Sequence, residues 1–142
     1  MALLDFVFVH SYSSCEDNWD VVSIGNGTLL GRITKAVQLA DELGVPVVAN
    51  DKIDVRNHSC YDAYGIENLY TARNTKEEVR SALAKSNSGK VLFVSSPDHL
   101  PRVVRDVLAL GGTSAFFAAS DTAFSQVGVK GVVVEEPAHK KL

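Results

Sequence analysis

A cluster of polar side chains able to bind or transfer a charged group follows a short apolar run late in the chain. Residues 95–102 read Ser-Ser-Pro-Asp-His-Leu-Pro-Arg, and the polar members are Ser95, Ser96, Asp98, His99 and Arg102. We expect them at a strand-to-helix junction, because residues 91–94 are apolar and Asp98 can cap a helix. Hydroxyls, open helix amides and a guanidinium together bind a phosphate or a carboxylate. A helix cap with an incidental arginine and a structural histidine is the alternative, and spacing alone leaves both open.

Polar residues also follow the other expected strands directly. They are His10 and Ser11 after residues 3–9, Asn50 and Asp51 after residues 45–49, and Ser120 and Asp121 after residues 115–119. Strand ends need polar loops in any fold, which accounts for part of this pattern. In a parallel sheet these residues share one edge, where ligands bind.

The rest of the chain alternates apolar runs with segments of helical periodicity. Expected strands cover residues 3–9, 45–49, 91–94, 115–119 and 131–134, and expected helices cover 33–43, 61–68, 75–85 and the segment between Asp98 and Gly111. Residues 10–31 are rich in Ser, Asn, Asp and Gly, which predicts a long loop with at most a minor strand at 21–24. Thr75 and Glu78 have the spacing of a capping box.

Strands that alternate with helices predict βαβ units. We therefore expect a single α/β domain over residues 1–142, Rossmann-like and doubly wound. Its mostly parallel sheet has about five strands, in an order such as 3-2-1-4-5, with helices on both faces.

Composition narrows the function classes. A hydrophobic fraction of 46% and a charged fraction of 22% are typical of a globular domain, and a net charge of −3 gives no general attraction to nucleic acid or anionic lipid. No apolar run approaches the roughly 20 residues that span a bilayer. We expect a cytoplasmic protein with reduced Cys15 and Cys60, and with neither a nucleic-acid nor a membrane partner. The oligomeric state is not indicated.

Three motifs in order resemble the DUF218 domain family, which includes the YdcF, SanA and ElyC proteins. They are Gly65-Ile66, then Asn74-Thr75-Lys76-Glu77, then the strand end Val94-Ser95-Ser96 followed by His99-Leu100-Pro101-Arg102. The resemblance covers residues 5 to about 112. It implies a Rossmann-like fold with a ligand cleft formed by the Asn-Thr and His-x-x-Arg segments. One member is associated with S-adenosylmethionine binding, which makes this compound a candidate cofactor.

Several positions depart from the family pattern. His10-Ser11-Tyr12 and Asn50-Asp51 stand where glycines usually follow the first two strands, and Glu78 replaces an asparagine. Glycines there let the backbone approach a ligand, so the departures bear on which ligand fits.

Our leading hypothesis is a site for an adenosine-containing or phosphorylated small molecule at the carboxyl edge of the sheet. Ser95, Ser96 and the following amides would hold an anion, with Arg102 as its counter-charge and His99 as the orienting group or general acid/base. The further candidate contacts are Asn74, Thr75, His10, Ser11 and Asn50. One rival is a hydrolase or phosphotransfer enzyme that uses His99, and another is a non-catalytic sensor or interaction module.

Two other motifs are weaker. Gly25-Asn26-Gly27-Thr28-Leu29-Leu30-Gly31 partly matches a dinucleotide fingerprint, but its third glycine is one position late, and a flexible lid is the alternative. His58-Ser59-Cys60 has no standard ligand spacing, so we expect no metal site.

Overall fold

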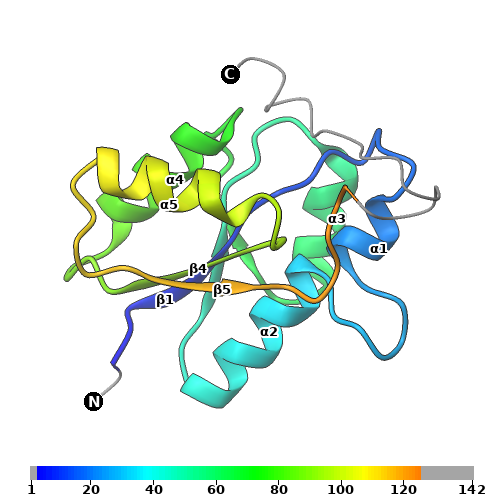
Figure 1. Ribbon diagram of the computed structural model, residues 1–142, viewed down its shortest axis with the longest axis horizontal. Helices are drawn as coiled ribbons and strands as arrows, with labels where there is room; N and C mark the ends of the chain where they lie inside the picture. The colour runs from blue at the N-terminus through cyan, green and yellow to red at the C-terminus, as the bar shows by residue number, and fades with distance from the viewer. Residues whose placement is uncertain (1–2, 126–142) are drawn as a thin grey trace.

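Five parallel strands form the centre of the protein (Figure 1). The structure is a computed structural model, and it describes residues 3–125. The strands are β1 (Phe6–Val9), β2 (Val47–Ala49), β3 (Glu67–Asn68), β4 (Val91–Ser95) and β5 (Phe116–Ala119). They pair in the order β3-β2-β1-β4-β5, and every pairing is parallel. The expected Rossmann-like fold class is therefore confirmed. The expected order 3-2-1-4-5 is wrong for the third expected strand, because residues 91–94 pair with β1 and the strand beside β2 is β3, which was not among the expected strands.

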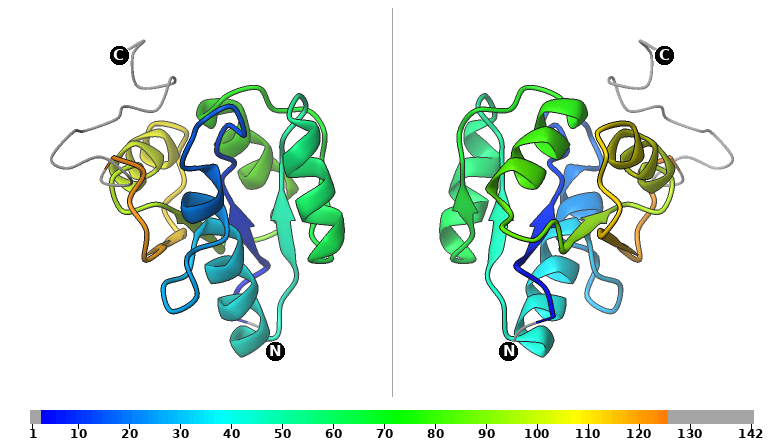
Figure 2. Two further views of the ribbon diagram at one scale, coloured as in Figure 1. Left: turned by 90° about the vertical axis from the view of Figure 1, so that its right-hand side faces the viewer. Right: turned by 90° about the vertical axis from the view of Figure 1, so that its left-hand side faces the viewer.

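Helices cover both faces of this sheet. They are α1 (Trp19–Ser23), α2 (Arg32–Leu43), α3 (Val55–Ala63), α4 (Thr75–Lys85) and α5 (Leu100–Ala109). The two core clusters place α2 and α3 on one face and α4 and α5 on the other. Figures 1 and 2 show α2 on the opposite side of the sheet from α4 and α5.

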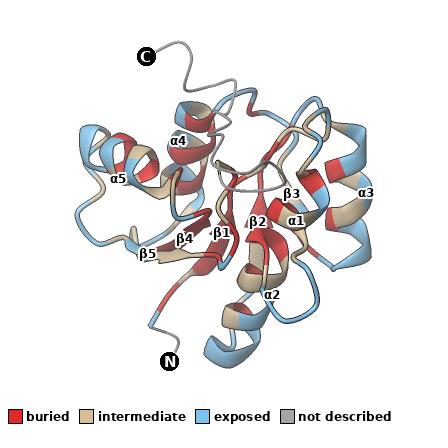
Figure 3. Cartoon of the chain, turned by 45° about the vertical axis from the view of Figure 1, so that its right-hand side comes forward, coloured by how far each residue is buried: buried red, intermediate tan, exposed pale blue. Residues whose placement is uncertain are grey.

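The central strands are apolar on both faces because each face packs against helices. In β1, Val7 and Val9 belong to the core cluster on the α2 side, and Phe6 and Phe8 belong to the cluster on the α4 side. Such two-sided burial explains the unbroken apolar runs of the sequence. Figure 3 shows the buried residues concentrated on the strands and on the inner sides of the helices.

The region predicted as a helix over residues 61–68 is instead the end of α3 followed by β3. α3 begins six residues earlier than we predicted, and the Asp54 side chain caps it through bonds from the amides of Arg56 and Asn57. Gly65 then adopts a positive φ of 70°, which ends the helical path, and β3 pairs with β2. The fifth predicted strand, residues 131–134, lies outside the described residues.

Residues 10–31 contain α1 where a minor strand was predicted. Trp19 and Val22, one turn apart on α1, pack with Tyr12 and Phe124 in a third apolar cluster. This tertiary packing holds a helix that is too short to form alone.

Candidate functional site

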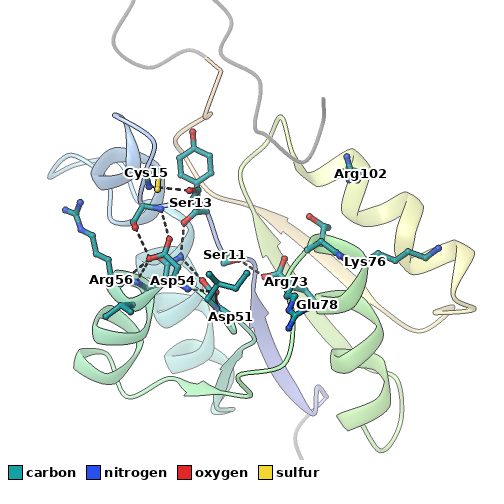
Figure 4. A pocket seen from close by; sticks show the side chains of 17 residues that line it. Ser11, Ser13, Cys15, Asp51, Asp54, Arg56, Arg73, Lys76, Glu78 and Arg102 are labelled. Atoms are coloured by element: carbon teal, nitrogen blue, oxygen red, sulfur yellow. Dashed lines mark hydrogen bonds between the residues drawn. The ribbon is translucent and has the colours of Figure 1, made fainter. Parts of the chain in front are cut away.

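A cleft of about 820 Å³ opens at the carboxyl edge of the sheet. Its lining residues lie within residues 11–15 after β1, residues 51–57 at the start of α3 and residues 73–78 at the start of α4, and Arg102 of α5 completes it (Figure 4). From β1 the chain winds toward β2 and β3 on one side of the sheet, and later toward β4 and β5 on the other. Doubly wound folds bind ligands at this reversal.

Four of the predicted site residues line the cleft. They are Ser11, Asn74, Thr75 and Arg102, which come from the loop after β1, the start of α4 and the first turn of α5. The fold thus brings together the Asn-Thr segment and the arginine of the His-x-x-Arg segment, although 26 or more residues separate them in the chain.

The other five predicted residues lie beneath the cleft and do not line it. His10, Asn50, Ser95, Ser96 and His99 are each at most 1% exposed. They form a buried polar layer between the apolar sheet and the cleft.

Thr75 connects this layer to the cleft. Its hydroxyl oxygen lies 3.2 Å from Nε2 of His99, a ring that is fully buried. Thr75 lines the cleft and His99 does not. The Thr75 hydroxyl is therefore a route by which a proton could pass between His99 and a ligand in the cleft.

Glu78 makes a second connection between the layer and the cleft. One carboxylate oxygen lies 3.2 Å from Nδ1 of His10, and the other accepts from the Ser11 amide at 2.9 Å. A proton on Nδ1 would donate to Glu78 and leave Nε2 as an acceptor, and Nε2 has no partner among the described residues. We predicted Glu78 only as half of a capping box.

Asn50 fastens the segment between β3 and α4. Its Oδ1 accepts from the amides of Thr71 and Ala72, and its Nδ2 donates to the hydroxyls of Thr71 and Ser81. Because these bonds satisfy the whole side-chain amide, Asn50 positions the start of α4 from below.

Arg32, at the start of α2, is a fully buried residue that the sequence reasoning missed. Its Nε donates to the Ser96 hydroxyl at 2.6 Å, and its Nη1 donates to the Ser11 carbonyl at 2.7 Å. Its guanidinium also lies over the Tyr12 ring, 5.1 Å from the centroid. Through Arg32, Ser96 therefore takes part in the hydrogen bonds that connect α2 to the ends of β1 and β4. Nothing in the sequence pattern marks this arginine, which stands at a helix start like many exposed ones.

No protein-family model, curated protein or solved structure matches this chain. The likeness to the DUF218 domain therefore stays a prediction.

The two sides of the cleft differ in charge (Figure 4). Arg73, Lys76 and Arg102 come from the α4 and α5 side, where the Glu78 carboxylate is bound to His10 and to the Ser11 amide. Asp51 and Asp54 come from the α3 side, where the cation Arg56 pairs with Asp20 at 2.8 Å. Arg73 and Lys76 are exposed, and neither forms an ion pair with another described residue. Arg73 and Lys76 are therefore available to an incoming anion.

The carboxylates on the acidic side of the cleft already accept hydrogen bonds from groups of the chain itself. Asp54 accepts from the amide and the hydroxyl of Ser14 and from two α3 amides. Burial is the largest single influence and raises the pKa of Asp54, but these hydrogen bonds outweigh it and lower the pKa below the usual 3.8. Asp51 accepts from the amides of Ile53 and Asp54 and from the Asn57 side chain.

The helix caps differ from those predicted by one position each. Asn74, and not Thr75, caps α4 through a bond from the Glu77 amide, and the Glu77 side chain accepts from the Arg73 amide. At α5 the N-cap position is His99, and the Asp98 carboxylate accepts instead from the amides of Phe124 and Ser125.

The glycine-rich loop does not form an open phosphate-binding turn. Gly25 and Leu30 form an isolated antiparallel bridge, and the Gly31 amide donates to the Ile24 carbonyl and the Thr34 hydroxyl. A Cβ at Gly31 would lie 2.4 Å from the Ser23 backbone. Close packing of the chain on itself therefore requires this glycine.

Three further observations concern residues 3–125. No group of three or more His, Cys, Asp or Glu side chains in this part of the chain is arranged to hold a metal ion. Cys15 and Cys60 are free thiols. None of the helices described is both long and apolar enough to cross a bilayer.

Proposed function

We propose that the protein binds a phosphorylated or adenosine-containing small molecule in this cleft, with the anionic group against the start of α4. The open α4 N-terminus carries the proposal. The amides of Thr75 and Lys76 donate no hydrogen bond within the described part of the chain, and the cap residue Asn74 is neutral. Arg73, Lys76 and Arg102 line the same cleft.

These groups suit a phosphate for electrostatic reasons. Open amides and the helix dipole favour negative charge at a helix start, and arginine binds phosphate through two parallel hydrogen bonds. The Thr75 hydroxyl and the Ser11 side chain add neutral donors on the cleft surface. Within this proposal, Ser95, Ser96, His10 and Asn50 support the edge from beneath.

The resemblance to the DUF218 family supports the same position, since the family's two motifs meet here. It also makes S-adenosylmethionine one of the adenosine compounds to test. If that compound binds as a methyl donor, the protein is a transferase.

Calorimetry with inorganic phosphate and with adenosine 5′-monophosphate tests the proposal. We expect both to bind, and the double variant Arg73→Gln/Lys76→Gln should lose about tenfold in affinity for each, as expected for charge-assisted bonds in a partly exposed site. Arg80→Gln is the matched control, because Arg80 is exposed on α4 but does not line the cleft. Absence of binding, or equal losses in the variant and the control, would refute the proposal.

A second candidate is the hydrolase or phosphotransfer activity, favoured by the 3.2 Å contact between Thr75 and His99. A hydroxyl within reach of an imidazole is the arrangement of an activated nucleophile. Turnover of p-nitrophenyl phosphate should then disappear in Thr75→Val and in His99→Gln and persist in Thr75→Ser. Phosphate binding without turnover favours the non-catalytic sensor.

A further inference from the structure

Two large apolar side chains line the cleft on its α3 side. Ile53 is 65% exposed and Val55 is 73% exposed, and both line the cleft. Neither belongs to an apolar core cluster. Single exposed apolar residues are common, but two that line the same cleft are typical of a ligand contact.

Local structure does not account for these residue types. Val55 is the first residue of α3, where a β-branched side chain gives no advantage in helix formation. Ile53 lies in the connection before the helix, a position where polar residues are usual. Burial and helix propensity therefore leave both choices unexplained.

The backbone holds this apolar pair in place. The Ile53 amide donates to the Asp51 carboxylate at 3.0 Å, and Asp54, between the two residues, caps α3. The surface they present is thus formed before a ligand arrives, which lowers the entropic cost of binding to it.

The same side of the cleft disfavours a second anion. The carboxylates of Asp51 and Asp54 line it, and Asp54 already occupies the open amides of α3. Arg56, the cation on this side, is paired with the Asp20 carboxylate at 2.8 Å. An anionic group is attracted to the α4 side and repelled from the α3 side, so a ligand has one preferred orientation.

We infer that the cleft binds a phosphate monoester whose organic part is uncharged and apolar on one face, with that face on Ile53 and Val55 and the phosphate at the start of α4. This inference rests on the proposed function and adds the ligand class. It disfavours compounds with an anionic group at each end, such as sugar bisphosphates.

Three probes that share a phosphate separate the two parts of the ligand. They are adenosine 5′-monophosphate, ribose 5-phosphate and inorganic phosphate, measured by calorimetry. Covering about 50 Å² of apolar surface corresponds to roughly an eightfold gain in affinity. We expect the adenosine compound to bind tighter than ribose 5-phosphate by about this factor.

The double variant Ile53→Ser/Val55→Ser should remove that advantage and leave the affinities for ribose 5-phosphate and phosphate unchanged. Leu108→Ser is the matched control, because Leu108 is 61% exposed on α5 and does not line the cleft. Circular dichroism checks that both variants fold.

The outcomes distinguish the two proposals. Equal affinity for the adenosine compound and ribose 5-phosphate, or an advantage that survives in the double variant, overturns the apolar subsite while phosphate binding stands. Failure of all three probes to bind overturns the proposed function, and the subsite with it.

Discussion

The helix starts of α3 and α4 face the same cleft and satisfy their amides in opposite ways. At α3, the Asp54 carboxylate accepts from two helix amides and from the amide and hydroxyl of Ser14. At α4, the neutral Asn74 side chain accepts from one amide, that of Glu77. The N-terminus of α3 thus already binds an anionic side chain, that of Asp54, and the N-terminus of α4 has room for an anionic ligand.

Because of this difference, we expect the start of α3 to contribute mainly to stability and the start of α4 mainly to ligand binding. The Asp54 carboxylate ties α3 to the loop after β1, which stabilises the fold. The cap at α4 satisfies only part of the first turn, so the positive end of that helix remains available to a ligand, with Arg73 and Lys76 beside it. The three predictions below test this separation, starting with the largest expected effect.

Removal of the α3 cap should cost the most stability. We expect Asp54→Ala to lower the free energy of unfolding by about 2 to 3 kcal/mol, because it removes an N-cap and the anchor of Ser14. Asn74→Ala should cost about 1 kcal/mol, the usual value for a cap alone. Urea unfolding measures both, and equal losses would contradict the comparison.

A negative cap at α4 should weaken binding more than it changes stability. Asn74→Asp places a carboxylate where the phosphate is proposed to bind, so we expect about a tenfold loss of affinity for inorganic phosphate. Unfolding free energy should stay within about 0.5 kcal/mol, because aspartate caps a helix as well as asparagine. Asn74→Ser, which keeps a neutral cap, is the control. Unchanged phosphate affinity in Asn74→Asp would place the anion elsewhere.

Acid should produce the smallest of these effects, at the start of α3. The pKa of Asp54 is below 3.8 in the folded protein, so the unfolded chain takes up this proton at a higher pH. The stabilisation from Asp54 is therefore complete above the unfolded pKa and is lost as the pH falls through the folded pKa. Asp54→Asn should lose less stability than the wild type between about pH 5 and pH 3 in urea titrations. If the unfolding free energies of the two proteins fell in parallel as the pH is lowered, Asp54 would not contribute to the acid dependence of stability.

The sequence predicted those helices and strands whose local residue pattern agrees with their packing in the fold. Residues 91–94 are apolar on both faces, and α2 ends at Gly44 in a left-handed conformation, so both boundaries were visible in the sequence. β3 was not visible, because two partly exposed residues at a sheet edge carry no apolar pattern. α1 was not visible because packing on Tyr12 and Phe124 holds it, and Phe124 is remote in sequence.

For the candidate site, the sequence predicted which residues lie at the carboxyl edge of the sheet. It did not predict which of their side chains are exposed in the cleft and which are buried beneath it. Polar residues after a buried strand mark the carboxyl edge, which located Ser96 and His99 correctly at that edge. Whether such a side chain reaches the surface depends on what covers it, and Arg32 and Thr75 cover these two. The cations Arg73 and Lys76 look like ordinary exposed charges until the fold places them beside Arg102.

The contact of Glu78 with Ser11 has a consequence for the kinetics of binding. It joins α4 to the segment that follows the central strand β1 and so helps to hold α4 in place. If the proposed anion binds there, we expect its association to be limited by diffusion and charge attraction more than by rearrangement. Association should slow as the salt concentration rises, with a single exponential phase in stopped-flow traces.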